Sequence, residues 1–319
     1  MQKLIIDADP GIGDAIAIAL AAADPQIDLL AVTAVNGCLS AKRAGRNIQT
    51  LLEWLDLPKN PRLGRPETED TDDVAGRLAG ETALAMRRLH GEYGLGSWQT
   101  GDADLHHPRD SAKMLCEVSL EHPHEVTLLT LGPLTNVALA QRRDHEFLSR
   151  LKGLVILGGT YAVPGDVSPV AEMNMAMDPV SARSVLRSPA TKTLVPLDVS
   201  RNFHLTFDQY QRLVQGTDSR TARLFTRLLP EYLRAHHEWL GMESALLPEV
   251  TALYAVTHPE KFQRRTCSID VETDGFLTKG MTVIDRRARP EGRNNIDVLT
   301  NVDPQAVADQ MRALLRVAN

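Results

Sequence analysis

The sequence predicts an α/β protein with an open, mostly parallel sheet flanked by helices and a helical cap. Two observations support this prediction. Short apolar, β-branched segments alternate with helical segments, and no linker divides the 319 residues. Such alternation is typical of βαβ units, and a chain of this length can bury a substantial core. We therefore expect a single domain over residues 1–319.

The predicted strands are short and apolar, which suits strands that are buried on both faces of a parallel sheet. The clearest are Lys3–Ile6, Leu29–Val35, Glu125–Leu131, Gly153–Leu157 and Lys192–Leu197. Two further candidates lie in the last third of the chain, at Thr266–Glu272 and Met281–Asp285.

Helical segments separate these strands. The first follows Asp14 and continues to Ala23, and its many alanine and isoleucine residues indicate a largely buried helix. The others are predicted at Ala41–Leu55, Glu81–Leu89, Ser111–Leu120, Leu134–Gln141, Pro179–Leu186 and Pro304–Val317. The segment Phe203–Glu238 is predicted to be mainly helical and to cap the sheet edge, whereas Pro58–Asp73, rich in proline and acidic residues, is predicted to be a surface loop.

The turn between the first strand and the first helix gathers three carboxylates. Asp7 and Asp9 lie on the same side of an extended chain, and Asp14 enters in the first turn of the helix. Helix capping would explain one of the three. Carboxylates this close repel one another unless a cation neutralises them or one of them holds a proton. The motif therefore predicts a divalent cation at the carboxyl end of the sheet, and Ca²⁺ or Mg²⁺ rather than Zn²⁺, because no histidine or thiolate accompanies it.

Composition excludes several classes of function. The net charge of −6 argues against a nucleic-acid partner. Three cysteines without paired or metal-type spacing indicate a reducing compartment. A buried strand begins within three residues of the N-terminus, which leaves no room for a signal peptide, and no apolar segment approaches the length of a membrane span. We therefore expect a cytoplasmic protein without a membrane partner.

A series of motifs resembles the inosine-uridine-preferring nucleoside hydrolase family. Residues Asp7–Ala15 are similar to that family's signature DxDPGxDDA. Further similar motifs follow in order, namely Arg46-Asn47, His90–Gly96, Leu131–Asn136, Leu157–Gly159, Ala171–Asn174 with Asp178-Pro179, and Gly280–Asp285. The paired aspartates alone also resemble a haloacid-dehalogenase-like phosphatase, but the Pro-Gly turn and the later motifs do not fit that class.

The resemblance implies hydrolysis of the N-glycosidic bond of a ribonucleoside to base and ribose, through an oxocarbenium-like transition state. It implies a homodimer or homotetramer, and a Ca²⁺ ion that binds the ribose diol and the attacking water. It implies that the ligands of this ion are Asp9, Asp14 and the backbone carbonyl of Leu131, and that Asp7 supports these ligands. Glu172 and Asn174 match the pair that holds the ribose hydroxyls, although a polar loop pair would look the same.

Three positions depart from the family pattern. Gly13 stands where the resemblance expects a general-base aspartate. Cys38 stands where the family commonly carries an asparagine that contacts the ribose, and it is either a site residue or an inert buried thiol. Asn36 lies two residues earlier and would substitute in part if the loop shifts. Leu247 stands where the resemblance expects a His-Asp-Pro motif, so an acid and a metal ligand are both missing.

Other residues offer compensation. Glu249 would reach the ion with its longer side chain, and His236 or His237 would act as a surrogate acid unless both are solvated helix residues. Asp166 replaces an asparagine near the ribose 5′ end and would disfavour a 5′-phosphate. His90 belongs to a glycine-rich loop that approaches the nucleobase in some members of the family, and this loop is a candidate lid.

Three functional hypotheses remain open at this point. The chain is an N-ribohydrolase with altered or impaired chemistry, a hydrolase of a modified nucleoside or another N-glycoside, or a catalytically inactive homologue that binds a nucleoside or ribose as a regulatory or partner protein. Loss of a general base or acid typically lowers a rate by about 10²–10⁴-fold. Ribose release separates the hydrolases from the inactive homologue.

Overall fold

An eight-stranded sheet organises the part of the chain that the computed structural model describes, which is residues 1–66, 80–100, 109–287 and 294–316. Neighbouring strands pair in parallel except for the last pair, which is antiparallel. The strand order is β3 (Arg62–Gly64), β2 (Ile27–Ala34), β1 (Gln2–Ala8), β4 (Val126–Thr130), β5 (Gly153–Leu157), β6 (Lys192–Val195), β12 (Ile296–Asn301) and β9 (Gln263–Cys267). The predicted mostly parallel α/β fold is confirmed.

The order of the strands reverses direction at β1. The chain first builds outward from β1 through β2 to β3, and then returns to the other side of β1 and builds β4, β5 and β6. At such a switch point the connections on the two sides run apart and leave a crevice beyond the carboxyl ends of the strands, where ligands bind in open α/β sheets. The end of β1 carries Asp7, so this crevice lies at the predicted carboxylate turn.

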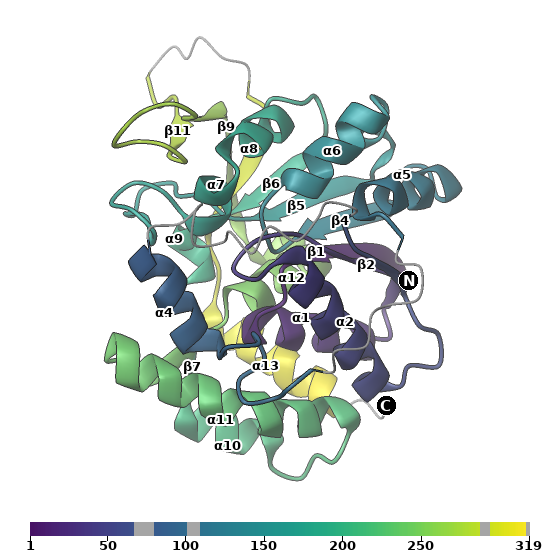
Figure 1. Cartoon of the computed structure of the whole chain (residues 1–319), viewed down its shortest axis with the longest axis vertical. Coiled ribbons are helices and arrows are strands. Elements are labelled where there is room, and N and C mark those ends of the chain that lie inside the picture. Colours follow the sequence, from purple (N-terminus) through teal and green to yellow (C-terminus); the bar gives the residue numbers. More distant parts are fainter. Residues whose placement is uncertain (67–79, 101–108, 288–293, 317–319) are drawn as a thin grey trace.

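Helices cover both faces of the sheet (Figure 1). The side chains of β1 alternate between the two hydrophobic layers, because successive residues of a strand point to opposite faces. Leu4 and Ile6 join the layer of α1, α2, α11, α12 and α13, whereas Ile5 joins the layer of α5, α6 and α8. The bounds are α1 (Ile12–Ala23), α2 (Ala41–Leu55), α5 (Ser111–Glu121), α6 (Thr135–Arg143), α8 (Pro179–Leu186), α11 (Arg220–Leu240), α12 (Pro248–Thr257) and α13 (Pro304–Leu315).

Shorter elements surround the carboxyl end of the sheet. Two antiparallel ribbons, β7 with β8 and β10 with β11, stand apart from the main sheet. Most of helix α11 lies within the predicted cap segment Phe203–Glu238, and helix α4, which was not predicted as part of the cap, packs against α11. The remaining bounds are α4 (Gly80–His90), α7 (Met173–Met177), α9 (Leu197–Ser200), α10 (Phe207–Val214), β7 (His204–Thr206), β8 (Ser244–Leu246), β10 (Ile269–Val271), β11 (Thr282–Ile284), and the 3₁₀ turns η1 (Leu148–Arg150) and η2 (Pro259–Lys261).

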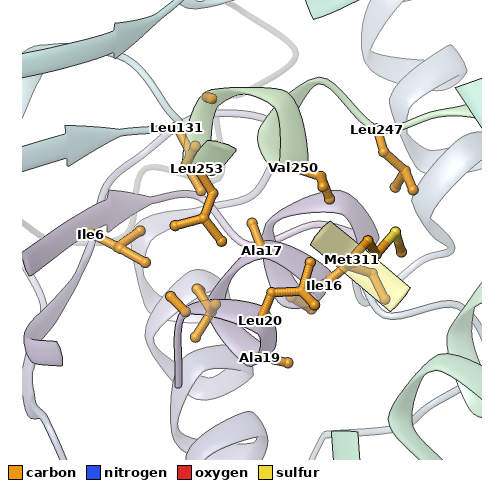
Figure 2. Packing of buried hydrophobic residues seen from close by; sticks show 14 of the residues in the cluster. Ile6, Ile16, Ala17, Ala19, Leu20, Leu131, Leu247, Val250, Leu253 and Met311 are labelled. Carbon is orange, nitrogen blue, oxygen red and sulfur yellow. The ribbon is translucent and has the colours of Figure 1, made fainter. Parts of the chain in front are cut away.

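Helix α1 is buried on almost every side, as its alanine and isoleucine content predicts. It packs against α12, α11 and α13. Figure 2 shows Val250 and Leu253 of α12 beside Ile6 of β1 and Ala17 of α1, all in one apolar cluster. This packing fixes the N-terminal turn of α12 relative to the N-terminal turn of α1.

Several predicted boundaries are wrong. Thr266–Glu272 is divided between β9 and β10, which belong to different sheets. Leu197 begins helix α9 rather than ending a strand. The predicted loop Pro58–Asp73 contains the edge strand β3, and its residues from 67 onward lie outside the described residues. Within the described residues, no helix is long and apolar enough to cross a membrane.

Candidate active site at the carboxyl ends of the strands

A cavity of about 400 Å³ opens at the switch point, between the strand ends and the cap helices α4 and α11. This volume is within the range of small-molecule sites. Most of the predicted site residues lie on its wall, namely Asp9, Asp14, Cys38, His90, Leu131, Asp166, Glu172, Asn174, His236 and Glu249. Five others, Asp7, Gly13, Asn36, His237 and Leu247, do not line it.

Asp9 is held at the bottom of this cavity by the loops that follow β2 and β4. Its Oδ2 accepts a hydrogen bond of 2.5 Å from the Cys38 amide, and its carbonyl accepts one of 3.3 Å from Cys38 Sγ. A Cβ on Gly37 or Gly132 would lie 2.0 or 2.5 Å from the carboxylate, so only glycine allows these loops to approach. Burial raises the pKa of Asp9 to about 6, although the bonds from Cys38 oppose this effect.

Asp7 lies beneath the cavity and is completely buried. Its Oδ1 accepts hydrogen bonds from Thr33 Oγ1 at 2.5 Å and from Asn136 Nδ2 at 2.8 Å. Burial raises its pKa to about 7. The side chain thus joins β1 to β2 and α6 and does not line the cavity, while its buried Oδ2 has no hydrogen-bond partner among the described residues.

Asp14 and Glu249 meet on one side of the cavity, from the first turns of α1 and α12. Asp14 Oδ2 accepts a hydrogen bond of 3.0 Å from the Gly11 amide and so caps α1. Asp14 Oδ1 and Glu249 Oε2 are buried and have no hydrogen-bond partner among the described residues. Burial, together with the charges of Asp9 and Glu249, raises the pKa of Asp14, and burial also raises that of Glu249 to about 7.

Glu172 and Asn174 form the opposite side. Glu172 caps α7, and its carboxylate accepts hydrogen bonds from the amides of Asn174, Met175 and Gly159 at 2.9, 3.1 and 2.8 Å. Burial and the nearby charge of Asp166 raise the pKa of Glu172 to about 8, while these amides oppose the shift. Asn174 Nδ2 donates to the carbonyls of Leu131 and Leu157 at 2.7 and 3.1 Å, which leaves its buried Oδ1 without a partner in the described structure.

Asp166 is the charged residue behind this pair. Arg201 forms an ion pair with it at 3.4 Å, and both residues line the cavity. Burial raises the pKa of Asp166, although the charge of Arg201 opposes this effect. The guanidinium group of Arg201, which sequence reasoning missed, therefore balances the negative charge of Asp166.

The three histidines have different surroundings. His236 lines the cavity, but its Nδ1 lies 2.9 Å from the Tyr232 carbonyl and its Nε2 accepts from the Leu246 amide, so both ring nitrogens are engaged. The side chain of His237 is 62% exposed and lies beside Glu243, away from the cavity. His90 Nδ1 accepts a hydrogen bond of 3.1 Å from the Ile12 amide. An amide can only donate, so the proton of the neutral His90 ring is on Nε2.

Burial, together with the neighbouring His236, lowers the pKa of His90 to about 4. His90 is thus a neutral ring at the cavity wall, which suits a hydrogen-bond donor better than a cation. Leu247 is fully buried in the apolar core and has no polar role. The cap also contributes Tyr232, which sequence reasoning missed because nothing in the pattern of α11 distinguishes it from a core residue.

The carboxylate side fits a hard divalent cation in its donor chemistry. Asp9, Asp14, Glu249 and the nearby carbonyl of Leu131 provide oxygen ligands, which Ca²⁺ and Mg²⁺ prefer. The partnerless oxygens of Asp14 and Glu249 are what such a site requires. The described residues contain no preassembled group of three or more His, Cys, Asp or Glu side chains that could hold a metal ion.

The fold and the cavity define an α/β protein with a small-molecule site at the switch point of its sheet, in which carboxylate and amide groups are set among apolar side chains. Residues 4–309 match the family model described as inosine-uridine preferring nucleoside hydrolase. The chain belongs to this family, and the resemblance in its sequence is confirmed. Members of the family are generally metal-dependent.

Relatives and solved structures agree with this assignment. Uridine nucleosidase 1 of Arabidopsis thaliana is 32% identical, over 98% of this chain and 93% of its own length. The inosine-uridine preferring nucleoside hydrolase of Crithidia fasciculata is 31% identical, over 91% of this chain and 90% of its own. The structure of a plant nucleoside hydrolase matches with a TM-score of 0.85 and 27% identity, over 100% of this chain and 99% of that one.

Proposed function

We propose that this protein hydrolyses the N-glycosidic bond of a ribonucleoside or a related N-riboside. Water adds its oxygen to the anomeric carbon of the ribose, the carbon–nitrogen bond breaks, and the base leaves with its electron pair and gains a proton. The observation that carries the proposal is the pairing of two polar walls in one cavity. Partnerless carboxylate oxygens and the Glu172–Asn174 pair line one cavity of about 400 Å³, which is large enough for a nucleoside.

Each wall has a separate task in this reaction. Glu172 and Asn174 hold ribose hydroxyls, with Asn174 Oδ1 as the free acceptor. Asp9, Asp14, Glu249 and the Leu131 carbonyl would hold a divalent cation, Ca²⁺ by the family resemblance, which when bound supplies orientation and a lower pKa for a coordinated water. His90, with its proton on Nε2, donates a hydrogen bond to the nucleobase.

The test is release of ribose from uridine, inosine and a panel of other N-ribosides, at high protein concentration with and without added Ca²⁺. Release that is proportional to protein and lost in Asp9→Asn supports the proposal. A nucleoside that raises the melting temperature without any release would instead identify a binding protein without hydrolase activity. A homodimer or homotetramer in the cytoplasm remains part of the proposal, and light scattering tests the oligomeric state.

A further inference from the structure

The space above Gly13 is occupied by another residue. A Cβ added to Gly13 would lie 2.1 Å from Oε2, 2.4 Å from Cδ and 2.6 Å from Oε1 of Glu249. The whole carboxyl group of Glu249 therefore fills the volume in which any other side chain at position 13 would begin. Glycine within a helix costs roughly 0.5–1 kcal/mol relative to alanine. Its presence in the first turn of α1 is explained by this contact.

The arrangement of the helices holds Glu249 in this place. Pro248 begins α12 and Glu249 follows in its first turn, while Val250 and Leu253 anchor the helix in the apolar cluster around α1 (Figure 2). The two N-terminal turns are thereby fixed beside each other. A carboxylate on α12 reaches the same corner of the cavity as a side chain on the first turn of α1 would.

The carboxylate of Glu249 faces the cavity. Its Oε2 is buried and has no partner among the described residues, although Glu249 lines the cavity together with Asp9 and Asp14. Asn174 Oδ1 and Asp14 Oδ1, on residues 4% and 5% exposed, are likewise without partners in the described structure. Buried acceptors without donors are costly. Several of them around one cavity indicate a ligand that brings O–H donors.

We propose that Glu249 supplies the carboxylate that α1 lacks at Gly13, and that Gly13 is the residue that makes room for it. The carboxylate at this corner of the cavity is then provided by α12 in place of α1, so the site still has it. In the reaction proposed above, on which this inference rests, Glu249 accepts a hydrogen bond from an O–H group at the anomeric end of the ribose, either the reacting water or a ribose hydroxyl.

The test is a cycle of four proteins, namely the wild type, Gly13→Asp, Glu249→Ala and the double variant. Gly13→Asp alone should lower the melting temperature, because the buried carboxylate of Glu249 must move aside to admit a second carboxylate at the same corner. Glu249→Ala should fold and lose about 100-fold or more in kcat/KM. The double variant should recover the melting temperature of Glu249→Ala and at least 10-fold of the lost kcat/KM. Glu260→Ala, an exposed glutamate near the other end of α12, is the matched control and should leave both unchanged.

Two outcomes would overturn the inference. One is a Gly13→Asp protein that is as stable as the wild type and at least as active. The other is a double variant whose melting temperature lies as far below that of Glu249→Ala as the melting temperature of Gly13→Asp lies below that of the wild type. The effects of the two substitutions would then be independent. If the wild type releases no ribose, the proposed function fails, and the melting temperatures alone still decide whether Glu249 fills the place of a side chain at position 13.

Kinetics identify the O–H group that Glu249 contacts. At Ca²⁺ concentrations that saturate both the wild type and the variant, a loss in kcat with KM unchanged in Glu249→Gln assigns the reacting water, and a rise in KM assigns a ribose hydroxyl. Unchanged kcat and KM in both Glu249→Gln and Glu249→Ala would show that Glu249 touches neither and would refute the proposed contact.

Discussion

The two polar walls of the cavity satisfy their carboxylates differently. Glu172 accepts three backbone hydrogen bonds and is part of the framework of α7. Asp14 and Glu249, on the opposite wall, each keep a buried oxygen without a partner among the described residues. The carboxylate of Glu172 is satisfied in the free protein, whereas those of Asp14 and Glu249 are fully satisfied only when a ligand or cation is bound. The difference indicates that Glu172 contributes to stability, while Asp14 and Glu249 are available for binding.

The sharpest test of this comparison is Asp14→Asn. It removes a charge from the crowded wall while keeping an acceptor for the Gly11 amide, so the cation-free protein should melt at a higher temperature. Activity should fall by about 100-fold or more, and any stabilisation by Ca²⁺ should shrink. Thermal melting of the wild type and the variant, with and without Ca²⁺, measures the melting temperature and the stabilisation by Ca²⁺, and ribose release measures the activity. Asp24→Asn, at the other end of α1, is the control and should not raise the melting temperature. A lower melting temperature in Asp14→Asn would contradict the comparison.

His90 tests the same wall through pH. Its folded pKa of about 4 lies below its unfolded value of about 6.5, so its contribution to stability is present above about pH 6.5 and is lost as the pH falls toward 4. The loss of folding free energy between these two pH limits amounts to about 3 kcal/mol. His90→Asn keeps an acceptor for the Ile12 amide and should lose part of this acid sensitivity. Urea unfolding at pH 7.5 and 4.5 measures it. The exposed His237→Asn is the control and should behave as the wild type.

The satisfied carboxylate of Glu172 should respond to neutralisation in the opposite direction from Asp14. Glu172→Gln puts an amide where three backbone donors need acceptors, so it should lower the free energy of unfolding by about 1–3 kcal/mol at pH 8. Denaturant unfolding measures the loss, with Glu146→Gln as an exposed control. A Glu172→Gln protein that is more stable than the wild type would show that the charge of Glu172, like that of Asp14, destabilises the free protein, which would contradict the comparison.

The sequence predicts the fold well where burial is continuous. Gly153–Leu157, Ala41–Leu55 and Pro179–Leu186 are predicted with the observed bounds, because apolar strands and amphipathic helices have clear periods. Strand β12 was not predicted, although it lies inside the sheet. Its mixed sequence Ile296–Asn301 carries Asp297 and two further polar residues, and its position is decided by pairing with β6 and β9.

Prediction of the site from the sequence is limited in the same way, because contacts that depend on tertiary packing leave no local pattern. The sequence identifies the aspartates of the first turn and the absence of a side chain at Gly13. It also offers Glu249 as a compensating residue, but not the space that its carboxylate occupies, because that contact depends on how α12 packs against α1. Arg201 and Tyr232 are missed for a related reason. Arg201 follows the last residue of α9 and Tyr232 lies in α11, and both reach the cavity through tertiary packing, which leaves no local pattern in the chain.

The division of the cavity between sheet and cap has a consequence for protein engineering. Met86 and Leu89 of α4 and Leu240 of α11 line the cap side of the cavity and are apolar. Libraries that vary these three positions can therefore change the shape of the pocket without replacing any of its carboxylates. Under the proposed function, two cap helices are where the range of accepted bases would be evolved.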